Sequence, residues 1–168
     1  FSDVYPYTKG ASTMMSILPP WVLVGKVEDV MNRLSSGQAR AQIVKDVANG
    51  IAGWENRIEV LGYENIFIAY VQSDANRDLE GLSIADAAKK RGQPCLEFIM
   101  DLLVAEKGDI GRLGANTCEE DLIDVISSPF TMIGSDGIDA GTKPHPRLYS
   151  TFPRVLAKYV REQHVLTL

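Results

Sequence analysis

The sequence predicts a mixed α/β chain, and three patterns indicate it. Apolar residues recur at helical spacing in several segments, most clearly in residues 94–108. A run of β-branched and aromatic residues, 66–71, indicates a strand between helices. Toward the C-terminus an apolar strand, a loop rich in Gly and Pro, and a helix follow one another within residues 130–164. That order is typical of the strand–helix units of parallel α/β folds.

The first third of the chain is predicted to be mainly helical. Residues 3–8 are expected to be the end of a strand that runs into a loop. Apolar spacing then predicts a helix over residues 27–36, which Gly37 ends. A second helix is predicted over residues 38–51, with Ser36 as its N-cap.

The middle of the chain changes character at residues 57–72. Ile58 and Val60 alternate with polar residues, and the β-branched run follows them, so we expect one or two short strands here. The next segment is predicted to be a helix that Ser83 caps and Gly92 ends.

The clearest helix has Pro94 in its first turn and Gly108 at its end. Residues 109–117 are predicted to form a strand, and residues 118–129 a short helix whose acidic first turn suits the helix dipole.

The last two elements are predicted to be a buried strand over residues 130–136, which ends at Asp136, and a helix over residues 151–164. The apolar face of that helix is expected to consist of Val155, Leu156, Tyr159 and Val160.

Composition excludes several classes of protein. The chain has 168 residues, of which 45% are hydrophobic and 23% charged, and its net charge is −5. We therefore expect no nucleic-acid partner, because no block of Lys and Arg is present to neutralise phosphates. No apolar run approaches the roughly 20 residues that span a bilayer, so no membrane association is expected.

The cysteines and the N-terminus predict a cytoplasmic protein. Cys95 and Cys118 are far apart in sequence, and we expect two free thiols in a reducing compartment, with a single disulfide as the alternative. The N-terminus has neither a basic start nor an apolar stretch, so no signal peptide is expected. The chain also opens on apolar and aromatic residues rather than a polar linker, and we expect it to be a piece of a longer protein.

Asp136 is the first candidate for a functional residue, because in α/β barrels the catalytic groups follow the C-terminal ends of strands. Its carboxylate could bind a metal ion or shuttle protons for an activated water. The alternative is an Asp that caps a turn. His145 and Arg147 lie on the loop that follows. Arg147 could bind a carboxylate through two parallel hydrogen bonds, and His145 could donate to a substrate or orient another group. Their alternative is a pair of solvated loop residues.

Three motifs together resemble the D-aminoacylase family, the N-acyl-D-amino-acid deacylases of the amidohydrolase superfamily. They are "YPYT…LPPW", "MIGSDG" and "HPRLYSTFPRVLAKYVRE". The resemblance implies a zinc-dependent hydrolase with a (β/α)₈ barrel and a small β-domain. It also implies that the substrate is a small N-acyl-D-amino acid, which is cleaved to a carboxylate and a D-amino acid.

The resemblance also implies roles for individual residues. Asp136 matches the barrel-end Asp that passes a proton from the water to the leaving nitrogen, and it is the one metal ligand that this chain could supply. Arg147 matches the Arg that holds the substrate carboxylate, and Tyr5 matches a Tyr that contacts the substrate. Ser12 matches a substrate-contacting Ser only with a shift of one residue, and His145 is expected to be a neighbour in the pocket.

One departure from the family pattern decides the expected organisation. The metal-binding His residues of the family lie before the "YPYT" motif, and this chain has only two His in all. We therefore expect a barrel fragment that binds no catalytic zinc and is inactive by itself. Residues 1–16 would form a barrel strand end and substrate loop, residues 17–108 an inserted α+β subdomain, mainly helical, and residues 109–168 the last barrel strand–helix units.

Two alternatives remain open at this point. The insert could make the chain a non-catalytic module for oligomer contacts, in which case the fragment would form a homodimer. The whole protein could instead be a cyclic amidase similar to dihydroorotases and hydantoinases.

Overall fold

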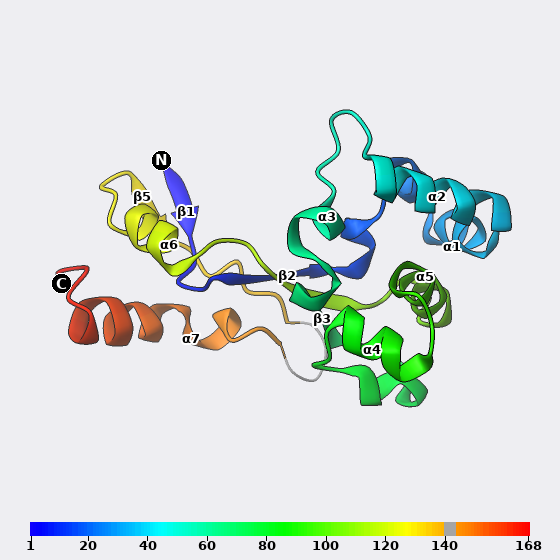
Figure 1. The fold of residues 1–168 in the computed structure, drawn as a ribbon. Helices are drawn as coiled ribbons and strands as arrows, with labels where there is room; N and C mark the ends of the chain where they lie inside the picture. Colours follow the sequence, from blue (N-terminus) through cyan, green and yellow to red (C-terminus); the bar gives the residue numbers. More distant parts are fainter. Residues whose placement is uncertain (140–143) are drawn as a thin grey trace. The chain divides into compact units, whose positions relative to one another are not determined.

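The computed structural model describes residues 1–139 and 144–168. The chain divides into two compact units. The terminal unit consists of Phe1–Gly10 and Ala115–Leu168, and the middle unit is Ala11–Gly114. Figure 1 shows the elements of both units.

The terminal unit contains a parallel pair of strands from opposite ends of the chain. Strand β1, Ser2–Val4, pairs with β5, Thr131–Ile133, so that Asp3 lies opposite Met132. Parallel neighbours need a long connection, and here it contains the whole middle unit. The expected parallel strand arrangement is therefore present.

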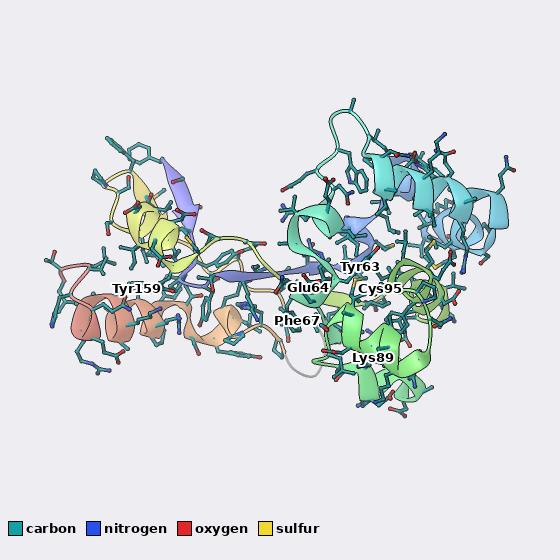
Figure 2. All side chains as sticks on the ribbon, viewed as in Figure 1. Tyr63, Glu64, Phe67, Lys89, Cys95 and Tyr159 are labelled. Carbon is teal, nitrogen blue, oxygen red and sulfur yellow. The ribbon has the colours of Figure 1, made fainter. Side chains whose placement is uncertain are left out.

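The helices of the terminal unit are α6, Glu119–Ile126, and α7, Arg147–Arg154, which continues directly into the π-helical segment η5, Val155–Glu162. Their small core is formed by the buried side chains Leu122, Ile126, Val155 and Tyr159. Tyr159, labelled in Figure 2, has no exposed surface.

The expected apolar face of the last helix is correct only in part. Val155 and Tyr159 are buried, but Leu156 is 53% exposed. Leu156 lies instead in an open apolar groove with Phe152 and Val160, on another side of the helix. The expected buried strand over residues 130–136 is also shorter and more open, since Met132 in β5 is 55% exposed.

The middle unit contains most of a small sheet and four longer helices. Strand order in the sheet is β2-β4-β3, and β3 and β4 are antiparallel. The strands are β2, Lys9–Thr13, β3, Ile66–Tyr70, and β4, Gly111–Ala115. The longer helices are α1, Val27–Ser35, α2, Gly37–Asn49, α4, Ile84–Arg91, and α5, Cys95–Ala105. The unit also contains the 3₁₀ turns η1, Met14–Ile17, η2, Pro20–Leu23, η3, Tyr63–Asn65, and η4, Asp74–Leu79.

The predicted helix caps of the middle unit are confirmed. The hydroxyl of Ser36 accepts a hydrogen bond from the backbone N–H of Ala39, and that of Ser83 accepts one from Asp86. Gly92 ends α4 with φ +68°, the left-handed conformation that glycine adopts without strain. These caps fix where α2 and α4 begin and end.

One predicted strand is a helix. Ile58 and Val60 lie in α3, Arg57–Leu61, because the side chain of Asn56 accepts a hydrogen bond from the Glu59 N–H and starts a helical turn.

Two expectations on composition can be compared with the structure. Cys95 and Cys118 are both free thiols. In the part of the chain that the structure describes, no helix has both the length and the apolar character that crossing a membrane requires.

Candidate functional site

The candidate site lies where β1 and β5 of the terminal unit end. Because these strands are parallel, their carboxyl ends lie at the same edge, the usual place for catalytic groups in α/β folds. A pocket of about 400 Å³ opens there. It is lined by Asp3, Val4, Tyr5, Gly134 and Asp136.

Asp136 lines this pocket, but it does not end the strand as expected. Strand β5 ends at Ile133, and Asp136 follows three residues later with φ +43°. Asp tolerates this left-handed conformation better than most residues do. Its side chain is 66% exposed, and its Oδ2 atom lies 2.9 Å from Nη2 of Arg147.

Arg147 is almost fully buried, with 1% of the residue exposed. It is the first residue of α7 rather than part of the preceding loop, which corrects the sequence-based expectation. Its guanidinium carbon lies 4.7 Å from the centre of the Tyr5 ring, and the Tyr5 hydroxyl accepts a hydrogen bond of 2.9 Å from Nδ2 of Asn116. Asp136, Arg147 and Tyr5 thus form one contiguous group, called the clamp below.

His145 holds the beginning of α7. Its Nδ1 atom accepts a hydrogen bond of 3.0 Å from the backbone N–H of Arg147. The other ring nitrogen, Nε2, must therefore carry the proton, and it donates to the Lys9 carbonyl at 3.0 Å. Burial, and next the charge of Arg147, lowers the pKa of His145. Both nitrogens of the neutral ring are thus engaged, and a contact between His145 and a substrate stays a prediction.

Residues that the sequence did not single out support the clamp. A Cβ atom on Gly10 would lie 2.1 Å from Nδ2 of Asn116 and 2.7 Å from the Tyr5 hydroxyl, so only glycine fits there. The Nε atom of Arg154 donates to the Pro6 carbonyl at 2.6 Å. No local sequence pattern distinguishes Gly10 or Asn116, because their contacts join segments far apart in the chain.

Ser12 belongs to the middle unit, where it is exposed on β2. Its contact with a substrate stays a prediction. Residues 140–143, between Asp136 and His145, lie outside the described residues.

The zinc that the resemblance implies does not find a complete ligand set among the described residues. A catalytic zinc needs about three protein ligands. Within residues 1–139 and 144–168, no group of three or more His, Cys, Asp or Glu side chains could hold a metal ion. Asp136 is a single carboxylate, and it pairs with Arg147.

Comparison with known proteins identifies curated relatives from Alcaligenes xylosoxydans xylosoxydans. Its D-aminoacylase is 35% identical over 85 residues, which are 51% of this chain and 16% of that protein. Its N-acyl-D-aspartate deacylase is 44% identical over 83 residues, 46% of this chain and 17% of the relative. Its N-acyl-D-glutamate deacylase is 57% identical over 37 residues, 22% of this chain and 8% of the relative. The chain thus spans less than a fifth of the length of these proteins.

Solved structures show the same fold. N-acyl-D-glutamate deacylase from Bordetella bronchiseptica, in complex with zinc and a phosphonate inhibitor, matches 99% of this chain with 25% of its own, at a TM-score of 0.64 and 23% identity. A D-aminoacylase structure from a study of its binuclear metal centre matches with the same coverage, a TM-score of 0.59 and 23% identity. No family model matches the chain.

These comparisons confirm the resemblance to the D-aminoacylases and N-acyl-D-amino-acid deacylases that the three motifs predict. The fold is confirmed as a mixed chain of helices and strands that corresponds to about a quarter of a D-aminoacylase structure.

Proposed function

We propose that the chain is part of a longer hydrolase that cleaves N-acyl-D-amino acids into a carboxylate and a D-amino acid. The observation that carries this proposal is the clamp, in which a buried Arg147 faces a carboxylate at the carboxyl ends of two parallel strands. The names of the curated relatives support the substrate class. The longer protein is called the whole enzyme below.

We also propose that the terminal unit is part of a (β/α)₈ barrel. The parallel pair β1 and β5, with a helix after β5, supports this assignment. So does the fold match to a quarter of an N-acyl-D-glutamate deacylase structure. In this proposal residues 17–108 are an insertion, and they fall within the compact middle unit Ala11–Gly114.

Arg147 is proposed to hold the α-carboxylate of the substrate. A guanidinium can donate two parallel hydrogen bonds to a carboxylate, which fixes its orientation as well as its position. Arg147 already binds one carboxylate oxygen, that of Asp136, and the Tyr5 ring supports the guanidinium from its face. Tyr5 therefore orients the guanidinium that binds the substrate carboxylate.

Asp136 is proposed to transfer the proton. A water adds to the amide carbon, the C–N bond breaks, and the leaving nitrogen needs one proton. The Asp136 carboxylate can accept that proton from the water and return it to the nitrogen, since its side chain lines the pocket and is 66% exposed. No step is assigned to zinc, because the described residues do not form its ligand set.

Steady-state kinetics of the whole enzyme test the proposal. Asp136→Asn should lower kcat by at least about a hundredfold, because proton transfer by a positioned side chain contributes 10²–10⁴-fold. Arg147→Met should raise KM for an N-acetyl-D-amino acid far more than for the N-acetyl amine that lacks only the carboxylate. Near-normal turnover by Asp136→Asn, or equal effects of Arg147→Met on both compounds, would exclude these roles.

Metal content tests the expectation that the 168-residue chain binds no catalytic zinc and is inactive by itself. Elemental analysis and the hydrolysis assay are run on the 168-residue chain and on the whole enzyme side by side. We expect zinc and turnover only in the whole enzyme. Stoichiometric zinc and activity in the short chain would place a metal site within this sequence.

A further inference from the structure

Arg154 lies seven residues after Arg147 on α7, two helical turns further along the same face. Its Nε atom donates a hydrogen bond of 2.6 Å to the Pro6 carbonyl. Its guanidinium carbon also lies 4.8 Å from the centre of the Tyr7 ring. One planar group thus makes an in-plane hydrogen bond and a stacking contact at once.

The segment that Arg154 contacts is the one that bears Tyr5. The backbone N–H of Tyr7 donates to the Tyr5 carbonyl at 2.8 Å, which closes a three-residue turn with Pro6 at its centre. Pro6 is buried, and its carbonyl is the group that Arg154 binds. The hydrogen bond from Arg154 therefore fixes the backbone immediately after Tyr5.

A second series of contacts leads from Arg154 to Arg147. The Tyr7 ring meets His145 edge to face, with ring centres 5.0 Å apart and an angle of 82° between the planes. His145 accepts the backbone N–H of Arg147. Arg154 is thus connected to two members of the clamp, to Tyr5 through Pro6 and to Arg147 through Tyr7 and His145.

We propose that Arg154 is a positioning residue that sets the distance between the Tyr5 ring and the Arg147 guanidinium, and so tunes recognition of the substrate α-carboxylate. This inference rests on the proposed function. The hydrogen bond at the edge of the guanidinium and the stacking contact on its face together resist rotation of α7 against the Tyr5–Tyr7 turn. Lys at position 154 could keep the charge, but it lacks the planar group that both contacts use.

A purely structural role for Arg154 predicts a different result. Loss of general stability would affect all substrates alike. Misplacement of Arg147 affects only compounds that carry the α-carboxylate, and an error of 1 Å at a binding group can cost on the order of 100-fold. The ratio between two substrates therefore distinguishes positioning from stability.

The test uses the whole enzyme with three variants, Arg154→Met, Arg154→Lys and Arg161→Met. Arg161 is the matched control, because it lies on η5 with its side chain 74% exposed and pairs only with the adjacent Glu162 among the contacts described. KM and kcat are measured for the N-acetyl-D-amino acid that the wild type cleaves best and for its decarboxylated N-acetyl amine. Calorimetry gives the dissociation constants of the same two compounds.

We expect Arg154→Met to raise KM and the dissociation constant of the amino acid about 10- to 100-fold. Both values for the amine should stay within about twofold of the wild type, Arg154→Lys should lie between, and Arg161→Met should match the wild type. Equal changes for both compounds, or none, would overturn the inference.

Failure of the proposed function would look different. A wild-type enzyme that hydrolyses neither compound but binds the amino acid more tightly than the amine would refute the activity and leave the clamp intact. The calorimetric comparison of Arg154→Met with wild type would then still decide the inference. A wild-type enzyme that binds both compounds equally does not recognise the carboxylate, and this result would also refute the positioning role of Arg154.

Discussion

Replacing Glu106 with Gln tests how much a buried carboxylate stabilises the middle unit. Glu106 is the one carboxylate that this unit buries almost completely, with 4% of the residue exposed. Its Oε2 atom accepts the backbone N–H groups of Gln72 at 2.7 Å and Ser73 at 2.9 Å. Its Oε1 atom accepts Nδ2 of Asn76 at 2.6 Å and the Ser73 hydroxyl. Gln keeps one of these oxygens, so two partly buried donors lose their acceptor. Each costs roughly 1–3 kcal/mol, and we expect a loss of about 3 kcal/mol of unfolding free energy.

Urea unfolding of the 168-residue chain at pH 7 measures this loss. Both tryptophans, Trp21 and Trp54, belong to the middle unit, so their fluorescence reports on that unit. Glu106→Gln should lower the urea midpoint without a change in slope. The control is Glu28→Gln at an exposed position of α1, which should stay within about 0.5 kcal/mol of wild type. Equal midpoints for the two variants would refute the reasoning.

The same pair of proteins gives a pH test. Burial raises the pKa of Glu106, but hydrogen bonds from Asn76, Ser73 and the backbone outweigh it, and the pKa falls below its ordinary value of 4.5. The folded state therefore binds this proton less readily than the unfolded state. The resulting stability is present above about pH 4.5 and is lost as the pH falls through the folded pKa. The difference in unfolding free energy between wild type and Glu106→Gln should therefore decrease as the pH falls below about 4.5.

Three further predictions concern the terminal unit. Gly10→Ala should separate Asn116 from the Tyr5 hydroxyl and lower the unfolding free energy by about 1–3 kcal/mol. Circular dichroism in urea measures this loss, and an unchanged unfolding midpoint would contradict the close fit. Tyr159→Phe removes the hydroxyl that donates to Glu119 at 3.0 Å. The same assay should show that the unfolding free energy falls by about 1 kcal/mol. A rise in unfolding free energy would mean that this hydroxyl does not stabilise the fold. His145 should titrate below pH 6.5 in an NMR titration, because burial disfavours its charged form, and a midpoint at or above 6.5 would contradict its assigned hydrogen bonds.

The helices of the middle unit could be predicted because their ends are marked locally. Ser36 and Ser83 cap helices through contacts three residues away, and Gly92 supplies the left-handed residue at a helix end. Ile58 and Val60 misled the prediction because a helix of five residues is too short for its 3.6-residue period to outweigh an alternating pattern.

The residues of the candidate site could be selected from the sequence, but their arrangement could not. Asp136 and Arg147 belong to a motif that the sequence displays. The contacts around them join residues more than a hundred positions apart, such as Asn116 with Tyr5, or Arg154 with Pro6. Those neighbours follow from the parallel pairing of β1 with β5, which no local pattern in the sequence specifies.

Because Arg147 lies on a helix and not on a loop, its side chain is held in a fixed position. A loop residue would find a substrate carboxylate by moving, and binding would then cost the entropy of ordering the loop. Arg147 instead begins α7, with its backbone N–H held by His145 and its carbonyl accepting the Thr151 hydroxyl at 2.8 Å. Sites on rigid elements keep a productive geometry more closely than sites on loops do. In the proposed function, a side chain fixed in this way would set the direction of the substrate carboxylate, which is one of the contacts that selection of one enantiomer of an amino acid requires.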